Sequence, residues 1–533
     1  MSTAIDVDNL TPPTTAVIHE KTPKASVWLR FRSFIWDSDT HLKSPEERRL
    51  LWKLDTAMLA CLCLGFFCKY LDQSNLSNAY VSGLKEDLGW SGNQLTYATS
   101  LYTAAYALMQ IPSTLIVQKV RPSLWLGGCE IAWCALTFAQ AGAHNTSTMY
   151  AFRFLVGIFE SAFFPVGLYL LGSWYTPTEL AKRTAIFHFT APAGVSFAGY
   201  MQAAVYKTLN GHGGLEGWRW LYIICGVCII FIDDWLNTKT LFLQIITLPC
   251  GLLVFFVLPN HPSSAKRWYL TDEELELARE RMRRVKRTPT DGLFRKAVLK
   301  KIFSNWHVYL LPLTYIFYGL SCAGSSYFGI YLKSTKKYSV EMINILPTFI
   351  SVIQAVTTLL YGFLSDYTGS RFWFTFGPMA FGAIPCGILA VWPNNYELKV
   401  FAFMTLGVQL MTAVIYSWWN EICSADPLER ALVISMSNGL QYVMSAWLPL
   451  LIFKQTDSPT FRKGFITDFV FVLITLVLLV LVKILHGREI RQKAPVDEEY
   501  LDSPKSADGS FDKKDAVYNL EDHLGNTAVL NDK

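Results

Sequence analysis

Apolar runs long enough to cross a bilayer recur along this chain, with short polar segments between them. The runs begin near Leu54, Thr96, Leu124, Thr148, Ala185, Trp220, Trp306, Asn344, Phe372, Leu398, Leu432 and Phe465. By the hydropathy criterion for membrane spans, this pattern predicts about twelve membrane-spanning helices. The expected fold class is therefore an all-α polytopic membrane protein.

The composition supports the same class. Of the 533 residues, 52% are hydrophobic and 14% aromatic, which is too apolar for an ordinary soluble protein. Because the excess of 47 Lys and Arg over 42 Asp and Glu is small, we expect no nucleic-acid partner. The eleven cysteines lie almost entirely in or beside apolar runs, where Cys behaves as a small hydrophobe. Neither disulfides, a metal site nor a cofactor is expected.

The positions of the basic residues predict the topology. They cluster before the first apolar run, between the sixth and seventh, and after the last. The positive-inside rule places all three segments in the cytoplasm, so each half must cross the membrane an even number of times. A six-plus-six arrangement with both termini cytoplasmic follows. Lys333, Lys336 and Lys337 then fall outside, against the rule.

The chain is expected to have five parts. They are a disordered N-terminal tail (1–50), a first six-helix half (51–260), a cytoplasmic linker with a helix (261–305), a second six-helix half (306–486) and a disordered C-terminal tail (487–533). In the linker, Thr271 and Glu274 form a capping-box pattern at the start of a helix with an acidic first turn and basic last turns. No cleavable signal peptide is visible, so the first run is expected to act as the targeting signal.

Charged residues interrupt the first apolar run. Lys69, Asp72 and Gln73 are three and four positions apart, which places them on one face of a helix. An acid and a base in hydrocarbon are energetically costly, so they indicate a substrate or ion path. A charge pair satisfied by a neighbouring helix is the alternative.

The fourth apolar run contains a second pair of opposite charges. Arg153 and Glu160 are seven residues apart, two turns along the same face and about 10 Å apart in height. Gly157 lies between them and is expected to leave room for a ligand. A structural ion pair that bridges two helices remains the alternative.

A loop after the eighth run resembles the loop signature of the major facilitator superfamily. Gly362, Asp366, Gly369 and Arg371 stand in register with that signature. The corresponding first-half loop, 110–122, lacks the acid, a departure typical of the superfamily's anion:cation symporter branch. The resemblance implies two six-helix halves that rock against each other.

Three longer segments narrow the resemblance. Phe67–Leu88, Gly172–Arg183 and Trp418–Asp426 resemble the fungal allantoate-permease group and, within it, the pantothenate transporters. The likeness extends over about residues 50 to 490. The Arg153–Glu160 spacing is similar to the pair in sugar-acid symporters and vesicular glutamate transporters. Bacterial sugar-acid relatives carry Arg where this chain has Gln73, so the carboxylate anchor here must be Arg153 or Lys69.

The resemblance implies a proton-coupled symporter of the plasma membrane that imports a small organic anion, and pantothenate is the first candidate substrate. The protein is expected to be a monomer. Protonating an acid would free a base for the anion, and burial favours the protonated carboxyl. The expected substrate-binding residues are Arg153, Lys69, Gln73, Tyr318, Tyr327, Trp418 and Asn420. Glu160 and Asp72 are the expected proton-coupling residues.

Other function classes remain open. A related transporter of biotin, nicotinate, allantoate, ureidosuccinate or a peptide-like anion is one. A membrane sensor would need a folded signalling domain, whereas the tails read as disordered. A membrane-embedded enzyme would need a nucleophile-base or metal constellation, and none is apparent in the sequence.

The likeness breaks in the sixth run, where 227–244 carries Asp233, Asp234, Asn237 and Lys239. Without the segment 227–244, the rest of 220–258 has the length of one membrane span. The segment begins with Val227-Cys228, which can be encoded as GTATGT, and ends with Gln244, which can be encoded as CAG. These two nucleotide sequences are plausible ends of an intron. We interpret the segment as translated from an unspliced short intron. A functional insertion is the alternative.

Overall fold

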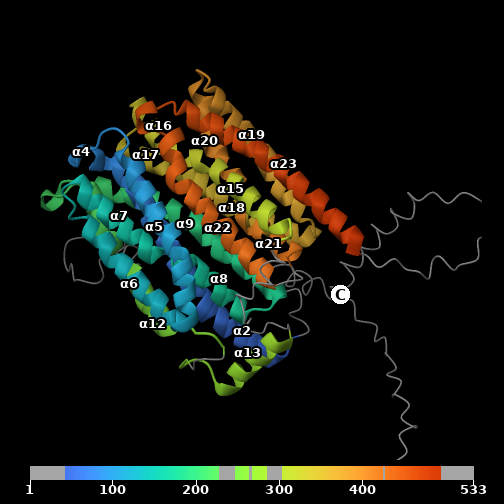
Figure 1. Cartoon of the computed structure of the whole chain (residues 1–533). Helices are drawn as coiled ribbons and strands as arrows, with labels where there is room; N and C mark the ends of the chain where they lie inside the picture. The colour runs from blue at the N-terminus through green and yellow to red at the C-terminus, as the bar shows by residue number, and fades with distance from the viewer. Residues whose placement is uncertain (1–42, 227–246, 263–266, 285–302, 424–426, 494–533) are drawn as a thin grey trace, which may run out of the picture.

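The computed structural model describes residues 43–226, 247–262, 267–284, 303–423 and 427–493 (Figure 1). The segment 227–244 and nearly all of both predicted tails lie outside these ranges. Within them the regular structure is entirely helical.

Helices of the first part, called here the N-terminal group, lie within 45–257. They are α2 (Pro45–Leu54), α3 (Ala60–Ala79), α4 (Lys85–Asp87), α5 (Gln94–Lys119), α6 (Pro122–Gln140), α7 (Thr146–Glu160), α8 (Phe163–Trp174), α9 (Pro177–Leu209), α10 (Gly217–Gly226) and α12 (Thr247–Val257). Short π-helical segments join α2 to α3 and α3 to α4, so 45–87 runs as one long helical segment. The linker helix α13 (Asp272–Arg284) follows.

Helices of the second part, the C-terminal group, lie within 307–493. They are α15 (His307–Ser321), α16 (Phe328–Thr335), α17 (Val340–Ile345), α18 (Thr348–Thr368), α19 (Arg371–Val391), α20 (Tyr396–Thr405), α21 (Thr412–Ile422), α22 (Pro427–Ile452) and α23 (Arg462–Lys493). Short 3-10 turns join α15 to α16 and α20 to α21, each near the middle of an apolar run.

The predicted fold class is confirmed. Eleven of the predicted span starts fall within helices, and the other, Trp306, is the N-cap of α15. Seven helical segments of the described part are long and apolar enough to cross a membrane. The count of twelve stays a prediction, because the sixth expected span runs into residues outside the described ranges.

Local signals in the sequence set the helix ends. At α13, Glu274 N–H donates to Thr271 Oγ1 at 3.3 Å, and Thr271 N–H donates to Glu274 Oε2 at 3.0 Å. The predicted capping box is therefore formed. Thr176 and Glu179 build a second capping box ahead of α9. Gly369, at φ +66°, ends α18 in the left-handed conformation that glycine adopts most easily.

The two groups meet along two pairs of long helices. The helix α5 packs against α22, and α9 packs against α18 and α17. Figure 1 shows α4 and α16 at one end of the bundle and α2 and α13 at the opposite end. These are called the α16 end and the α13 end below.

Polar contacts join the two groups at the α16 end. Lys333 Nζ lies 2.8 Å from Glu86 Oε1, and Asn344 Nδ2 donates to Ser82 Oγ at 2.9 Å. The backbone N–H of Gln455 donates to Asn93 Oδ1 at 2.8 Å. The two groups are thus tied together at this end.

Candidate functional site

The ammonium group of Lys69 is buried near the middle of α3. Its side chain is 1% exposed, and Nζ donates to Tyr106 Oη at 3.1 Å. The same atom lies 4.6 Å from the ring centroid of Tyr106 and 4.7 Å from that of Tyr70. Aromatic faces and one hydroxyl thus surround this charge, and no carboxylate of the described residues pairs with it within 4.0 Å.

Tyr102 on α5 stands between Arg153 and Glu160 of α7. Its hydroxyl donates to Glu160 Oε1 at 2.8 Å, and its ring centroid lies 4.6 Å from Arg153 Cζ. The sequence placed this acid and base on one helical face, about 10 Å apart in height, with room for a ligand between them. In the structure the side chain of Tyr102 lies in this interval and contacts both residues.

Asp72 faces α10 from the next turn of α3. Its Oδ1 accepts from Asn75 Nδ2 at 3.5 Å, and that amide also lies 3.1 Å from Cys225 Sγ. Glu160 and Arg153 both lie close enough to Asp72 to interact with it electrostatically. Lys69 and Arg153 in turn interact with Glu160. The structure therefore brings the four charged residues of the first and fourth runs together.

Several buried polar atoms of this cluster have no hydrogen-bond partner in the described part of the chain. They are Arg153 Nε, Glu160 Oε2 and Asp72 Oδ2. Buried polar groups are normally paired, because leaving one unpaired costs about 1–3 kcal/mol. A site with two bases, two acids and unused hydrogen-bonding atoms can take up a polar anion or a proton.

Gly157 does not provide space for a ligand, contrary to the prediction. A Cβ at this position would lie 2.4 Å from the carbonyl oxygen of Tyr102 and 3.1 Å from Ala105 Cβ. The glycine instead allows α7 to approach α5 closely. This approach puts Tyr102 within reach of both Arg153 and Glu160.

The C-terminal group reaches the cluster through Tyr442 on α22. Its ring centroid is 4.5 Å from that of Tyr106, whose hydroxyl accepts from Lys69. The contact between the two tyrosine rings thus links the surroundings of Lys69 in the N-terminal group to α22 in the C-terminal group. A change in how the groups pack would therefore change the surroundings of Lys69.

Two of the predicted binding residues of the second half, Tyr318 and Asn420, use their polar groups in hydrogen bonds within the protein. Tyr318 Oη accepts from the backbone N–H of Met411 at 3.0 Å and lies 3.0 Å from Thr412 Oγ1, so it holds the start of α21. Asn420 Nδ2 donates to the Tyr416 carbonyl of its own helix at 2.8 Å. These polar groups already have protein partners.

The other two are occupied with aromatic packing. The Tyr327 ring stacks on Phe453 at 4.3 Å between centroids, and Trp418 meets Phe372 edge to face at 6.1 Å. The structure does not bring Tyr327 or Trp418 into contact with Arg153. Gln73 is partly exposed, and its buried Oε1 has no hydrogen-bond partner in the described part.

The loop signature forms a compact ion-pair cluster. Arg371 Nη1 binds Asp366 Oδ1, and Arg371 Nε lies 2.8 Å from Glu421 Oε1. Gly369 makes the turn between the acid and the base, and a Cβ at Gly362 would meet Ala185 Cβ of α9 at 3.7 Å. The motif thus positions the ends of α18, α19 and α21.

Four tyrosines of the site were missed in the sequence, Tyr70 among them although it follows Lys69 directly. Tyr102 and Tyr106 are four positions apart, which does place them on one face of a helix. That spacing, in an apolar run with few other hydroxyl-bearing rings, was a usable signal. Tyr442 offered none, since its partner lies on a helix more than 300 positions away.

Comparison with known families and sequences gives consistent matches. Residues 62–449 match the model of the Major Facilitator Superfamily. The pantothenate transporter liz1 of Schizosaccharomyces pombe is 32% identical over 491 residues, covering 91% of each chain. The pantothenate transporter FEN2 of Saccharomyces cerevisiae is 31% identical and covers 80% of this chain and 82% of its own. The vitamin H transporter of the same yeast is 27% identical, covering 85% and 74%.

Solved structures share the fold at low identity. The proton:xylose symporter XylE bound to 6-bromo-6-deoxy-D-glucose aligns with a TM-score of 0.60 at 14% identity, covering 80% of this chain and 94% of that one. A bacterial homologue of the human lysosomal transporter Spinster, inward-facing and occupied, aligns at 0.54 and 16% identity, covering 80% and 96%.

Proposed function

This chain belongs to the major facilitator superfamily, and we propose that it is a proton-coupled symporter that imports pantothenate. Membership makes it a multi-pass membrane transporter, not an enzyme. The substrate is inferred from the two pantothenate transporters that align over four fifths or more of the chain. The observation that carries the proposal is the buried cluster of Lys69, Asp72, Arg153 and Glu160.

In this proposal the substrate carboxylate binds Arg153, and Lys69 adds a second positive charge. Guanidinium matches a carboxylate with two parallel hydrogen bonds, so Arg153 is the better anchor. Pantothenate also carries an amide and hydroxyl groups, which suit the tyrosine hydroxyls beside Lys69 and the amide of Gln73. Tyr318 acts by holding the start of α21, and Asn420 Nδ2 is already bound to a carbonyl of its own helix.

Proton coupling is assigned to Glu160, with Asp72 second. As a carboxylate, Glu160 neutralises part of the positive charge that the anion needs. Protonation removes that competition, so bound proton and bound anion favour each other to the same degree. Tyr102 connects the two events, because it touches both the acid and the base.

We place the α13 end in the cytoplasm and the protein, as a monomer, in the plasma membrane, by the positive-inside rule and the alternating access of related folds. The contacts between the groups at the α16 end then correspond to a state closed to the outside. Lys333 fits this assignment despite its positive charge, because it pairs with Glu86 across the groups.

Uptake in a yeast strain that lacks its own pantothenate transport tests the proposal. Expression should restore growth on low pantothenate and the uptake of labelled pantothenate, more strongly at acidic than at neutral external pH. Labelled biotin, nicotinate and allantoate, offered separately, test the alternative substrates. Uptake of biotin without pantothenate would overturn the substrate assignment and leave the transporter class intact.

Arg153→Ala tests the anchor. It should abolish uptake while the protein still reaches the cell surface, because no other guanidinium lies in the cluster. Arg283→Ala is the matched control, since that side chain is 70% exposed on α13. Near-normal uptake by surface-verified Arg153→Ala would remove Arg153 from the site.

A further inference from the structure

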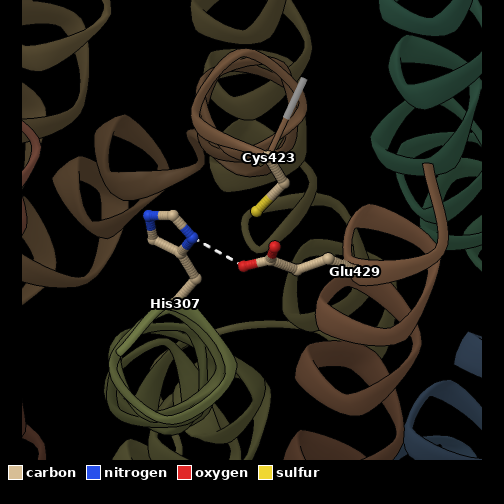
Figure 2. A group of neighbouring side chains, drawn as sticks. All are labelled: His307, Cys423 and Glu429. Atoms are coloured by element: carbon tan, nitrogen blue, oxygen red, sulfur yellow. Dashed lines mark hydrogen bonds and ion pairs between the residues drawn. The ribbon is translucent and has the colours of Figure 1, made fainter. Parts of the chain in front are cut away.

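A histidine, a cysteine and a glutamate meet where three helices of the C-terminal group begin or end. His307 is the first residue of α15, Cys423 is the C-cap of α21, and Glu429 lies in the first turn of α22. One donor atom from each lies within 4.8 Å of the other two (Figure 2). All three side chains are buried, at 5%, 2% and 6% exposure.

The imidazole of His307 is held from both sides. Its Nδ1 lies 2.6 Å from Glu429 Oε1, and its Nε2 lies 2.9 Å from Glu489 Oε2 on α23. Asn305 Nδ2 donates to the other oxygen of Glu429 at 3.0 Å. In metal sites, a ligating histidine usually donates its second N–H to a carboxylate, which fixes the ring and raises its basicity. Glu489 stands in that position.

We propose that His307, Cys423 and Glu429 bind one Zn²⁺ ion. Zinc accepts nitrogen, sulfur and carboxylate ligands together and is borderline in softness, whereas Mg²⁺ and Ca²⁺ require oxygen ligands. Zn–N and Zn–O bonds of about 2.0–2.2 Å and a Zn–S bond of about 2.3 Å place tetrahedral donors roughly 3.3–3.7 Å apart. All three donor atoms already lie within 4.8 Å of one another, and His307 Nδ1 and Glu429 Oε1, now 2.6 Å apart, must move about 0.7–1.1 Å further apart to admit the ion.

The ion would displace the proton of the hydrogen bond between His307 Nδ1 and Glu429 and the thiol proton of Cys423, and both protons would go to solvent. Its three protein ligands come from three helices, so binding fastens the ends of α15, α21 and α22 to one another. The fourth position is filled by water or by a further ligand. This site is distinct from the cluster around Arg153, and the inference does not depend on which anion is carried.

The test uses the purified full chain in detergent, stripped of metal with a chelator. Competition with a zinc-binding dye and elemental analysis should give one Zn²⁺ per chain. His307→Ala and Cys423→Ser should each weaken binding at least tenfold. His144→Ala, an exposed histidine, and Cys63→Ser, a cysteine in the first span, are the matched controls and should bind as the unmodified protein does.

Cobalt gives a second readout that loss of folding cannot imitate. Co²⁺ bound at this site should show a thiolate-to-metal charge-transfer absorption, which Cys423→Ser abolishes while its far-ultraviolet circular dichroism stays unchanged. Zinc should also raise the unfolding temperature of the unmodified protein and leave that of Cys423→Ser unchanged. If no stoichiometric Zn²⁺ binds, or if both variants bind as tightly as the controls, the cluster is a structural ion pair only and the proposal fails.

Discussion

Gly157→Ala tests whether the close approach of α5 and α7 builds the site. The new Cβ would lie 2.4 Å from the Tyr102 carbonyl oxygen, whereas ordinary contacts begin near 3.4 Å. To relieve the overlap, the two helices must separate by about 0.6–1 Å, as in other overpacked cores. Since Tyr102 moves with its backbone, its 2.8 Å hydrogen bond to Glu160 stretches beyond useful length.

The magnitude follows from two opposing terms. Overpacking a buried contact costs about 1–3 kcal/mol. Replacing glycine by alanine inside a helix returns up to about 1 kcal/mol. Gly128→Ala isolates the first term, because that position is also helical and a Cβ there meets nothing within 4 Å. The two variants should therefore differ by about 1–3 kcal/mol in stability.

Thermal unfolding of both purified variants, followed by tryptophan fluorescence, measures that difference. Gly157→Ala should unfold at a temperature lower than Gly128→Ala by about 1 °C for each kcal/mol, because the shift per kcal/mol falls as chain length grows. Uptake should be lost in Gly157→Ala and retained in Gly128→Ala at equal surface expression. If Gly157→Ala is as stable and as active as Gly128→Ala, the α5–α7 contact does not set the position of Tyr102, and the bridging role assigned to Tyr102 is wrong.

Four further predictions concern proton coupling, the closed α16 end and the segment 227–244. Glu160→Gln mimics a protonated acid, so exchange of labelled for unlabelled substrate should persist while accumulation driven by a pH gradient is lost; accumulation that acid still stimulates would exclude Glu160 as the proton carrier. Tyr102→Phe removes a hydrogen bond worth about 1.5–3 kcal/mol to a charged group but keeps the ring against the guanidinium, so it should weaken the response of uptake to pH more than substrate affinity. Lys333→Met should favour opening of the α16 end, so a single cysteine added there should react faster with an impermeant maleimide than the same cysteine in a protein that keeps Lys333; equal reaction rates would show that the contact between Lys333 and Glu86 does not keep this end closed. Sequencing of the mature transcript should show a message without the codons for 227–244, and their presence in the dominant message, with loss of uptake on deletion, would contradict the intron interpretation.

Much of the fold could be predicted because each membrane span carries its own signal. A helix must satisfy its backbone hydrogen bonds internally in hydrocarbon, so length and hydropathy alone indicate where it runs. The capping box at Thr271 and the turn at Gly369 were predictable for a similar reason, since both depend on neighbours within a few positions. The sixth span could not be settled in this way, because 227–244 interrupts its apolar pattern.

The candidate site was predictable in part. Charges in apolar runs are rare and costly, and this drew attention to Lys69, Asp72, Arg153 and Glu160, which the structure does bring together. Aromatic and amide residues are common in every span, so their presence predicts little. Tyr327, for example, packs against Phe453 and not against the charged cluster.

The sequence by itself determined that this chain is a helical membrane protein and that Lys69, Asp72, Arg153 and Glu160 lie within its apolar runs, because the energy of a residue in hydrocarbon depends on its own chemistry. The tertiary structure decided which side chains meet those charges. Tyr102, Gly157 and Tyr442 acquire their roles from how α5, α7 and α22 pack, and His307 and Glu429 meet although 122 positions separate them. Contacts of this kind depend on the approach of whole helices, and no local spacing in the sequence records that distance.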